Sequence, residues 1–160
     1  MPFRIAKATA EDAGLILEFI RKLAAYERLT HEVVATEQSI RESLFGPHPA
    51  GEVLLAYEDQ QPVGFAVYYQ NFSTFLGLPG LYLEDLFVEP AHRGKGYGQA
   101  LFAAAACAAY ERGGRMNWAV LKWNQPSIDF YKKLGAIELD EWRMWRLSGE
   151  ALRKVAESAR

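Results

Sequence analysis

The sequence has little of what disulfide-bonded, metal-binding and nucleic-acid-binding proteins need. It contains one cysteine, Cys107, so no disulfide can form within the chain. Its three histidines, His31, His48 and His92, lack the spacing of metal ligands, and we expect no metal site. The net charge over 160 residues is only −2, which provides no general field to attract nucleic acid or an anionic membrane. We therefore expect a cytoplasmic protein with no nucleic-acid or membrane partner.

Long apolar segments are missing as well. Residues 1–12 contain no apolar signal-peptide core, and the longest apolar run, residues 100–110, is too short and too rich in alanine to span a bilayer. Cys107 lies in that run, and we expect it to be a small core residue rather than a nucleophile. With 50% hydrophobic and 24% charged residues, the composition is that of an ordinary globular chain, and we predict one domain over residues 1–160.

Hydrophobic spacing predicts a mixed α/β fold. Alternating apolar residues indicate strands, and apolar residues spaced by three and four indicate helices. The predicted strands cover residues 3–7, 52–57, 63–72, 81–88, 116–123 and 136–147. The predicted helices run from Thr9 to about Tyr26, from Thr36 to Gly46, from Tyr97 to Arg112, from Pro126 to Gly135 and from Ser148 onward. The sequence has no internal repeat, low-complexity stretch or linker, which fits a single domain.

A glycine-rich loop, Arg93-Gly-Lys-Gly-Tyr-Gly98, connects a predicted strand to a predicted helix. Its alternating glycines can turn several backbone N–H groups toward one point, and the helix adds its positive N-terminal end. Arg93 and Lys95 add full charges, so the loop suits a diphosphate. A plain turn that needs positive φ angles is the alternative.

Two other phosphate-binding patterns do not fit this loop. A P-loop requires Ser or Thr after the lysine, whereas Gly96 follows Lys95. The dinucleotide-binding pattern requires a third glycine one residue later and an acid about 20 residues on, whereas residues 112–115 contain no acid. A nucleotide-binding module is therefore disfavoured.

Two motifs resemble those of a known family. Arg93-x-x-Gly96-x-Gly98, after the strand Leu86-Phe87-Val88, is similar to the acetyl-CoA-binding motif of the GNAT N-acetyltransferase superfamily. Residues 124–136, with the sequence Asn-Gln-Pro-Ser-Ile-Asp-Phe-Tyr-Lys-Lys-Leu-Gly-Ala, are similar to the other hallmark of that superfamily. Further segments resemble the spermidine/spermine acetyltransferases and their thialysine-acetylating relatives, namely residues 23–27, 82–85, 120–127 and 148–154.

The resemblance implies the GNAT fold, in which helices flank a central, mostly antiparallel mixed sheet. It implies an N-acetyltransferase that uses acetyl-CoA, acts by direct attack in a ternary complex, needs no metal and forms a homodimer. The acceptor would be a primary amine of a small molecule, such as a diamine, a polyamine or a lysine-like amine like thialysine. The residues implied in acetyl-CoA binding are Leu86, Phe87, Val88, Arg93, Gly94, Lys95, Gly96, Tyr97, Gly98, Gln99, Asn124, Ser127, Tyr131 and Lys133.

Acetylation of an amine requires proton transfers, and Tyr131 is our candidate for one of them. An alkylammonium group has a pKa near 10.4, so only about one part in two thousand is neutral at pH 7. The site must accept the ammonium proton, and the departing thiolate needs a proton in return. Asn124, Ser127 and Tyr131 are spaced by three and four, so they can share one helix face. The resemblance makes this tyrosine the acid, and a packing tyrosine is the alternative.

Glu84 and Asp85 are adjacent acids in an otherwise apolar predicted strand. Charges there are costly unless they are paired or hydrated, and a cationic amine, or the water that takes its proton, would justify them. A buried salt bridge to an arginine is the alternative. The resemblance places Glu84 at the substrate amine as a catalytic residue, and it adds Tyr26 and Glu27 as substrate contacts.

Two other functions remain open for the same acetyl-CoA site. A protein or peptide acetyltransferase, acting on lysine or an N-terminus, would need a peptide groove, which one sequence cannot show. A non-catalytic acyl-CoA-binding module would lack Tyr131 or the acid pair, and both are present.

Arg143 and Leu134 stand where the polyamine enzymes have an acidic and a basic residue. The segment Trp142-Arg-Met-Trp145 is a candidate dimer contact.

Overall fold

The computed structural model describes residues 2–159. The chain divides into two compact units, Met1–Leu121 and Lys122–Arg160. The first unit carries the sheet, the glycine-rich loop and the acid pair, and the second carries the helix with Tyr131. The single domain predicted for residues 1–160 stays a prediction.

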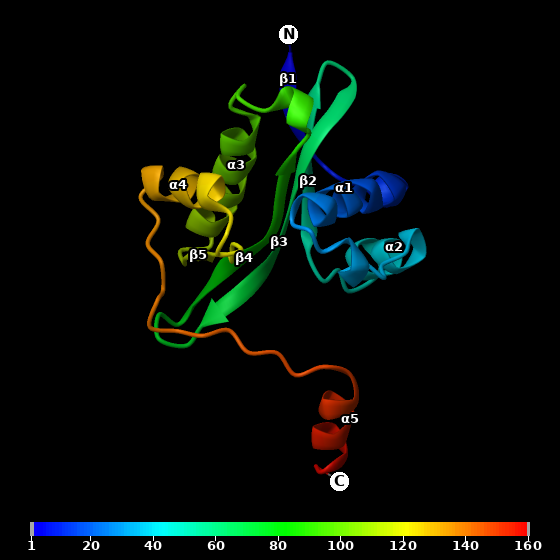
Figure 1. Cartoon of the computed structure of the whole chain (residues 1–160), viewed down its shortest axis with the longest axis vertical. Coiled ribbons are helices and arrows are strands. Elements are labelled where there is room, and N and C mark those ends of the chain that lie inside the picture. The colour runs from blue at the N-terminus through cyan, green and yellow to red at the C-terminus, as the bar shows by residue number, and fades with distance from the viewer. Residues whose placement is uncertain (1, 160) are drawn as a thin grey trace. The chain divides into compact units, whose positions relative to one another are not determined.

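A mixed sheet with helices on both faces forms the first unit. Its strands are β1 (Phe3–Lys7), β2 (Glu52–Glu58), β3 (Gln61–Ser73), β4 (Leu78–Val88) and β5 (Met116–Asn117), and its helices are α1 (Ala13–Tyr26), α2 (Glu37–Phe45) and α3 (Tyr97–Glu111). The strands lie in the order β1-β2-β3-β4-β5, and neighbours pair antiparallel except β4 and β5, which pair in parallel. Helices α1 and α2 cover one face of the sheet and α3 covers the other (Figure 1). None of the helices formed by residues 2–159 is long and apolar enough to cross a membrane.

The face of the sheet beneath α1 and α2 holds a core of large apolar side chains. Phe19 of α1 stacks on Phe65 of β3 with ring centroids 5.3 Å apart, and it packs against Phe87 of β4. Burying one side chain of this size contributes roughly 1.5–3 kcal/mol. Phe87 thereby anchors the end of β4 that leads into the glycine-rich loop. The rest of the buried cluster is Ala13, Ile16, Leu17, Ile40, Val53 and Leu55.

On the other face of the sheet, α3 buries Leu101, Ala105 and Ala109, which are spaced four residues apart. Cys107 lies two residues from this stripe, on the opposite side of the helix, and it is exposed. The prediction that Cys107 is a core residue is therefore wrong. The sequence of α3 is rich in alanine on all sides, so its apolar spacing does not distinguish the buried face.

Two irregularities shape β4. Its register with β3 shifts between Leu83 and Asp85, so Glu84 is the extra residue of a β-bulge. Within the described residues, β5 pairs only with Leu81 and Tyr82, so the rest of β4 has a strand neighbour on its β3 side alone. The strand predicted over residues 116–123 is reduced to Met116–Asn117, because its pairing with β4 ends there.

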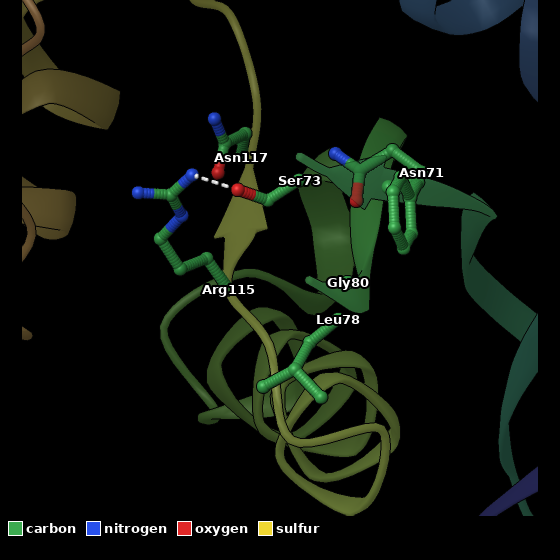
Figure 2. Close-up of a pocket in the computed structure, with 7 residues that line it drawn as sticks. Asn71, Ser73, Leu78, Gly80, Arg115 and Asn117 are labelled. Atoms are coloured by element: carbon green, nitrogen blue, oxygen red, sulfur yellow. Dashed lines mark hydrogen bonds between the residues drawn. The ribbon is translucent and has the colours of Figure 1, made fainter. Parts of the chain in front are cut away.

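Close backbone contacts hold β5 against the start of β4. A Cβ at Gly114 would lie 2.1 Å from the carbonyl oxygen of Pro79, so only glycine fits there. The backbone N–H of Leu81 donates to the carbonyl of Arg115 at 2.8 Å. The Arg115 guanidinium donates to the Ser73 hydroxyl at 2.9 Å across a polar pocket (Figure 2). The first two contacts join the residues just before β5 to the start of β4, and the third joins them to the end of β3, far from the glycine-rich loop.

The second unit contains α4 (Gln125–Lys133) and α5 (Gly149–Glu157). The side chain of Asn124 caps α4 by accepting from the backbone N–H of Ser127 at 3.4 Å. Residues 136–147, predicted as a strand, form no strand in the part of the chain that the structure describes. That prediction is wrong because a strand needs a neighbour for its backbone hydrogen bonds, and an alternating pattern does not supply one.

Candidate active site

The glycine-rich loop, residues 93–98, joins a short 3-10 helix (Pro90–His92) to α3. Gly94 and Gly96 have φ angles of 80° and 85°, a left-handed backbone that residues with side chains rarely adopt. A Cβ at either glycine would meet nothing beyond its own neighbours within 4 Å. Gln99 is exposed in the first turn of α3. The loop therefore presents bare backbone beside the positive end of a helix, as an anion site requires.

Arg93 holds the loop against β4 and α1. Its Nε donates to the carbonyl of Val88 at 2.8 Å. Its guanidinium carbon lies 5.1 Å from the ring centre of Tyr26 and 5.5 Å from that of Phe87, both within the range of cation–π attraction. The structure thus brings a predicted cofactor residue, Arg93, beside a predicted substrate residue, Tyr26.

Lys95 is paired within the protein. Its ammonium group lies 2.8 Å and 3.2 Å from the two carboxylate oxygens of Glu58, the last residue of β2. The Tyr97 hydroxyl donates to the same carboxylate at 2.5 Å, and His92 Nδ1 lies 2.8 Å from it. Only 7% of the Glu58 side chain is exposed. Three residues in and around the loop therefore meet on one buried acid, which the sequence analysis missed.

These contacts keep Glu58 ionised. The pKa of Glu58 is lowered to about 2, first by the hydrogen bond from Lys95 and then by the one from Tyr97. The hydrogen bond to Glu58 raises the pKa of Tyr97 to about 12. One feature of the sequence indicated where Glu58 lies: by strand alternation it shares a face of β2 with Leu54 and Ala56, opposite Val53 and Leu55, which pack in the core beneath α1 and α2. No feature of the sequence indicated which side chains approach that face.

Three carboxylates lie close enough for their charges to interact where α1 ends and β4 bulges. The pKa of Asp85 is raised to about 7, first by burial and then by the charges of Glu84 and Glu27. Burial and the charge of Glu84 also raise the pKa of Glu27. A salt bridge to an arginine would lower these pKa values instead, so their direction favours a site for a cation over a buried salt bridge. We call Glu27, Glu84 and Asp85 the acidic group.

Leu86, Phe87 and Val88 lie on the part of β4 beyond its pairing with β5. Their edge away from β3 faces no strand formed by the described residues, so an extended ligand could add to it as a strand does. The side chain of Phe87 packs in the core at the same time. The backbone and the side chains of this segment can therefore serve binding and packing together.

The remaining predicted site residues belong to the second unit. Asn124 is buried at the cap of α4, Ser127 lies in the first turn and Tyr131 follows one turn later, on the predicted face. The ring of Tyr131 lies 5.5 Å from that of Phe130. Lys133 is exposed at the last position of the helix.

Comparison with known families agrees with these features. The model of the acetyltransferase (GNAT) family matches residues 18–136. The match covers the acidic group, the glycine-rich loop and α4. It therefore includes every segment in which the sequence predicts a site residue.

Relatives match the chain over nearly its whole length. A thialysine N-epsilon-acetyltransferase of Bos taurus is 39% identical over 164 aligned residues, which cover 95% of this chain and 96% of the relative. An L-ornithine N5-acetyltransferase of Arabidopsis thaliana is 30% identical and covers 95% of this chain and 87% of the relative.

The fold is also found among solved structures. An integron cassette protein from the mobile metagenome of V. cholerae superposes with a TM-score of 0.81 at 27% sequence identity, covering 98% of this chain and 99% of that one. The predicted fold, a mostly antiparallel mixed sheet flanked by helices, is confirmed. The chain belongs to the GNAT acetyltransferase family and is an acyltransferase.

Proposed function

We propose that this protein transfers an acetyl group from acetyl-CoA to a primary amine of a small, lysine-like molecule. The observation that carries the proposal is the acidic group, Glu27, Glu84 and Asp85, in the same unit as a loop built to receive an anion. The acids suit a cationic acceptor, and the loop suits the diphosphate of the donor. Relatives named for thialysine and ornithine acetylation support an acceptor of this class.

Two places in the first unit would suit acetyl-CoA. The bare backbone at Gly94 and Gly96, beside the start of α3, can donate N–H groups to a diphosphate. The open edge of β4 at residues 86–88 can exchange hydrogen bonds with the amide groups of the pantetheine arm. The charge of Lys95 is neutralised by Glu58, so the backbone carries most of the attraction for the diphosphate.

The acidic group would bind the acceptor and take its proton. Glu84 is exposed at the bulge of β4, where an incoming ammonium can reach it. Asp85, with a pKa of about 7, is divided between its two forms near neutral pH and can accept a proton, directly or through water. Removing this proton gives the amine nitrogen the lone pair with which it attacks the thioester.

Tyr131 would protonate the leaving group. A bond forms between the amine nitrogen and the acetyl carbon, and the bond between that carbon and sulfur breaks. The ammonium proton passes to the acidic group, and the Tyr131 hydroxyl gives its proton to the thiolate. The nitrogen loses a second N–H proton as the amide forms, and this proton, carried by solvent, restores the Tyr131 hydroxyl. We assign this role to Tyr131 because it lies on the polar face of α4 with Ser127, within the motif that resembles the family hallmark.

A thiol-release assay with acetyl-CoA tests the acceptor class. The acceptors compared are thialysine, lysine, ornithine, a diamine, spermidine, an aminoglycoside and a peptide with a free N-terminus and an internal lysine. We expect release well above the amine-free rate with the small lysine-like amines and near that rate with the peptide. Release with the peptide alone would instead favour a protein acetyltransferase, and no release with any amine would contradict the proposal.

We propose in addition that the protein forms a homodimer. Residues 136–147 carry large apolar side chains that are exposed: Trp142 is 74%, Met144 is 78% and Trp145 is 89% exposed. Aromatic, Met and Arg side chains are enriched in protein interfaces. Sedimentation at micromolar concentration should give a dimer, and alanine at Trp142 and Trp145 should shift it toward monomer. A wild-type monomer at that concentration would end the proposal.

A further inference from the structure

Glu58 is a buried acid outside the acidic group, and its partners account for its burial. A buried carboxylate is costly unless it is paired and hydrogen-bonded. Lys95 and the Tyr97 hydroxyl both donate to it, and His92 Nδ1 lies 2.8 Å away. The ring of Tyr97 stacks on that of Phe3, with centroids 4.2 Å apart and planes 5° from parallel, which fixes the direction of its hydroxyl. The pairing is therefore built from several elements.

The three partners of Glu58 surround the glycines of the loop in sequence. His92 precedes the loop, Lys95 lies between Gly94 and Gly96, and Tyr97 begins α3. Lys95 and Tyr97 thus fasten the chain within and after the segment with left-handed glycines, and His92, before it, lies 2.8 Å from the same carboxylate. The space beside both glycines stays open. Glu58 therefore fixes the loop through its side chains and leaves its backbone free for a ligand.

The pairing also changes what Lys95 can contribute. Both carboxylate oxygens of Glu58 contact its ammonium group, so its charge is neutralised before any diphosphate arrives. The remaining attraction for an anion comes from backbone N–H groups and from the N-terminus of α3. Both depend on the conformation of the loop, which Glu58 holds.

We propose that Glu58 is a positioning residue for the acyl donor, and that Lys95 acts through Glu58 rather than by touching the diphosphate. Glu58 holds the loop in the conformation that directs its backbone N–H groups to one point. This inference rests on the proposed binding of acetyl-CoA at the loop. It replaces the expectation from the sequence that Lys95 supplies its charge to the diphosphate directly.

A double-mutant cycle with Glu58→Gln and Lys95→Met tests the inference, with CoA affinity measured by calorimetry. We expect each single variant to weaken CoA binding about tenfold or more. In Lys95→Met the carboxylate loses a partner and its charge is left near the phosphates. In the Glu58→Gln background that charge is absent, so Lys95→Met should cause little further loss.

Direct contact between Lys95 and the diphosphate predicts the opposite result. Glu58→Gln would release the lysine, so CoA would bind as well as before or more tightly. Lys95→Met would then cost at least as much in the Glu58→Gln background as in the wild type. Either outcome overturns the inference.

A milder variant and a kinetic measurement separate positioning from general stability. Tyr97→Phe removes one donor to Glu58 without changing a charge, and it should weaken CoA binding several-fold; unchanged affinity in a folded Tyr97→Phe protein would also overturn the inference. In Glu58→Gln the KM for acetyl-CoA should rise while the KM for the amine and kcat stay near their wild-type values. A variant that merely loosens the fold would change all three.

Variants at Gly96 tell failure of this inference from failure of the proposed function. Gly96→Ala and Gly96→Asp both strain a residue with φ of 85°, but only the second adds a charge that repels phosphate. CoA binding that is equal in these two variants and the wild type would show that the loop is not the donor site. If Gly96→Asp loses more CoA affinity than Gly96→Ala, the loop is the donor site. If the effects of Glu58→Gln and Lys95→Met are additive at the same time, only the positioning role of Glu58 is overturned.

Discussion

A Cβ placed at Gly98 would lie 3.7 Å from Cγ2 of Val88, which is an ordinary van der Waals distance. Gly98 lies in the first turn of α3 and is not among the glycines with positive φ. Packing and backbone geometry within the protein therefore do not require glycine at position 98. Gly96 differs from Gly98, because its φ of 85° does require glycine. If the donor diphosphate binds at this turn as proposed, its close approach accounts for the glycine at position 98.

Gly98→Ala should therefore separate stability from donor binding. We expect the variant to be more stable by about 0.5–1 kcal/mol, because alanine favours a helix over glycine. We expect its affinity for CoA to fall about tenfold or more, because the added methyl group occupies ligand space. Thermal unfolding and calorimetry measure the two quantities.

The matched control is Ala103→Gly, at an exposed position of the same helix. It should lower the stability by about 1 kcal/mol and leave CoA affinity unchanged. Wild-type CoA affinity in Gly98→Ala would contradict the placement of the diphosphate at this turn.

Asp85 should make the protein less stable as the pH rises. Its pKa is about 7 in the folded protein against an ordinary value of 3.8, so the fold disfavours the ionised form. The resulting loss in the free energy of unfolding is absent below pH 3.8, grows between pH 3.8 and 7, and is constant above pH 7, on the order of 4 kcal/mol at most. Asp85→Asn should therefore gain stability over the wild type across this window. Urea unfolding at pH 4 and pH 8 measures the difference, and a difference that is the same at both pH values would contradict the shift.

Glu84→Gln should act mainly on the acceptor amine. It removes one attraction for the ammonium group, so the KM for the amine should rise about tenfold while CoA affinity stays unchanged. The charge of Glu84 raises the pKa values of Asp85 and Glu27, so its loss should lower both and move the rising limb of the pH–rate curve to lower pH. Glu11→Gln, at an exposed position, controls for the change in net charge. If neither the pH profile nor the amine KM changes, the acidic group has only a structural role.

Tyr131→Phe should lower turnover without disturbing binding. The substitution removes one hydroxyl group and almost no volume, so folding and CoA affinity should be retained. We expect kcat to fall on the order of a hundredfold, the usual scale for loss of a general acid. Tyr110→Phe, at a position 85% exposed on α3, should have no effect on kcat. Full activity in Tyr131→Phe would mean that the thiolate leaves unassisted or through water.

The sequence predicts those parts of the site whose residues lie close together in the chain. The glycine-rich loop, the adjacent acids Glu84 and Asp85, and the polar face of α4 each follow from spacing within one segment. Gly94 and Gly96 have the positive φ angles that the sequence analysis associated with a plain glycine-rich turn. Such features depend on local geometry, which short-range patterns encode.

The parts that the sequence did not predict depend on contacts between distant segments. Glu58 meets Lys95 and Tyr97 across 37 and 39 residues of chain, and no spacing rule links them. A segment forms a strand only where a neighbouring strand pairs with its backbone. This requirement limits β5 to two residues and explains why residues 136–147 form no strand.

We have proposed that this chain moves an acetyl group from acetyl-CoA to a small primary amine. The most direct measurement supplies acetyl-CoA labelled with carbon-13 in its acetyl group together with equal amounts of thialysine, ornithine, spermidine and a lysine-containing peptide. Mass spectrometry then shows which acceptor carries the label. We expect label on a small amine, at a rate that falls in Tyr131→Phe and Glu84→Gln. Label on the peptide alone, or labelled acetate with no acetylated amine, would contradict it.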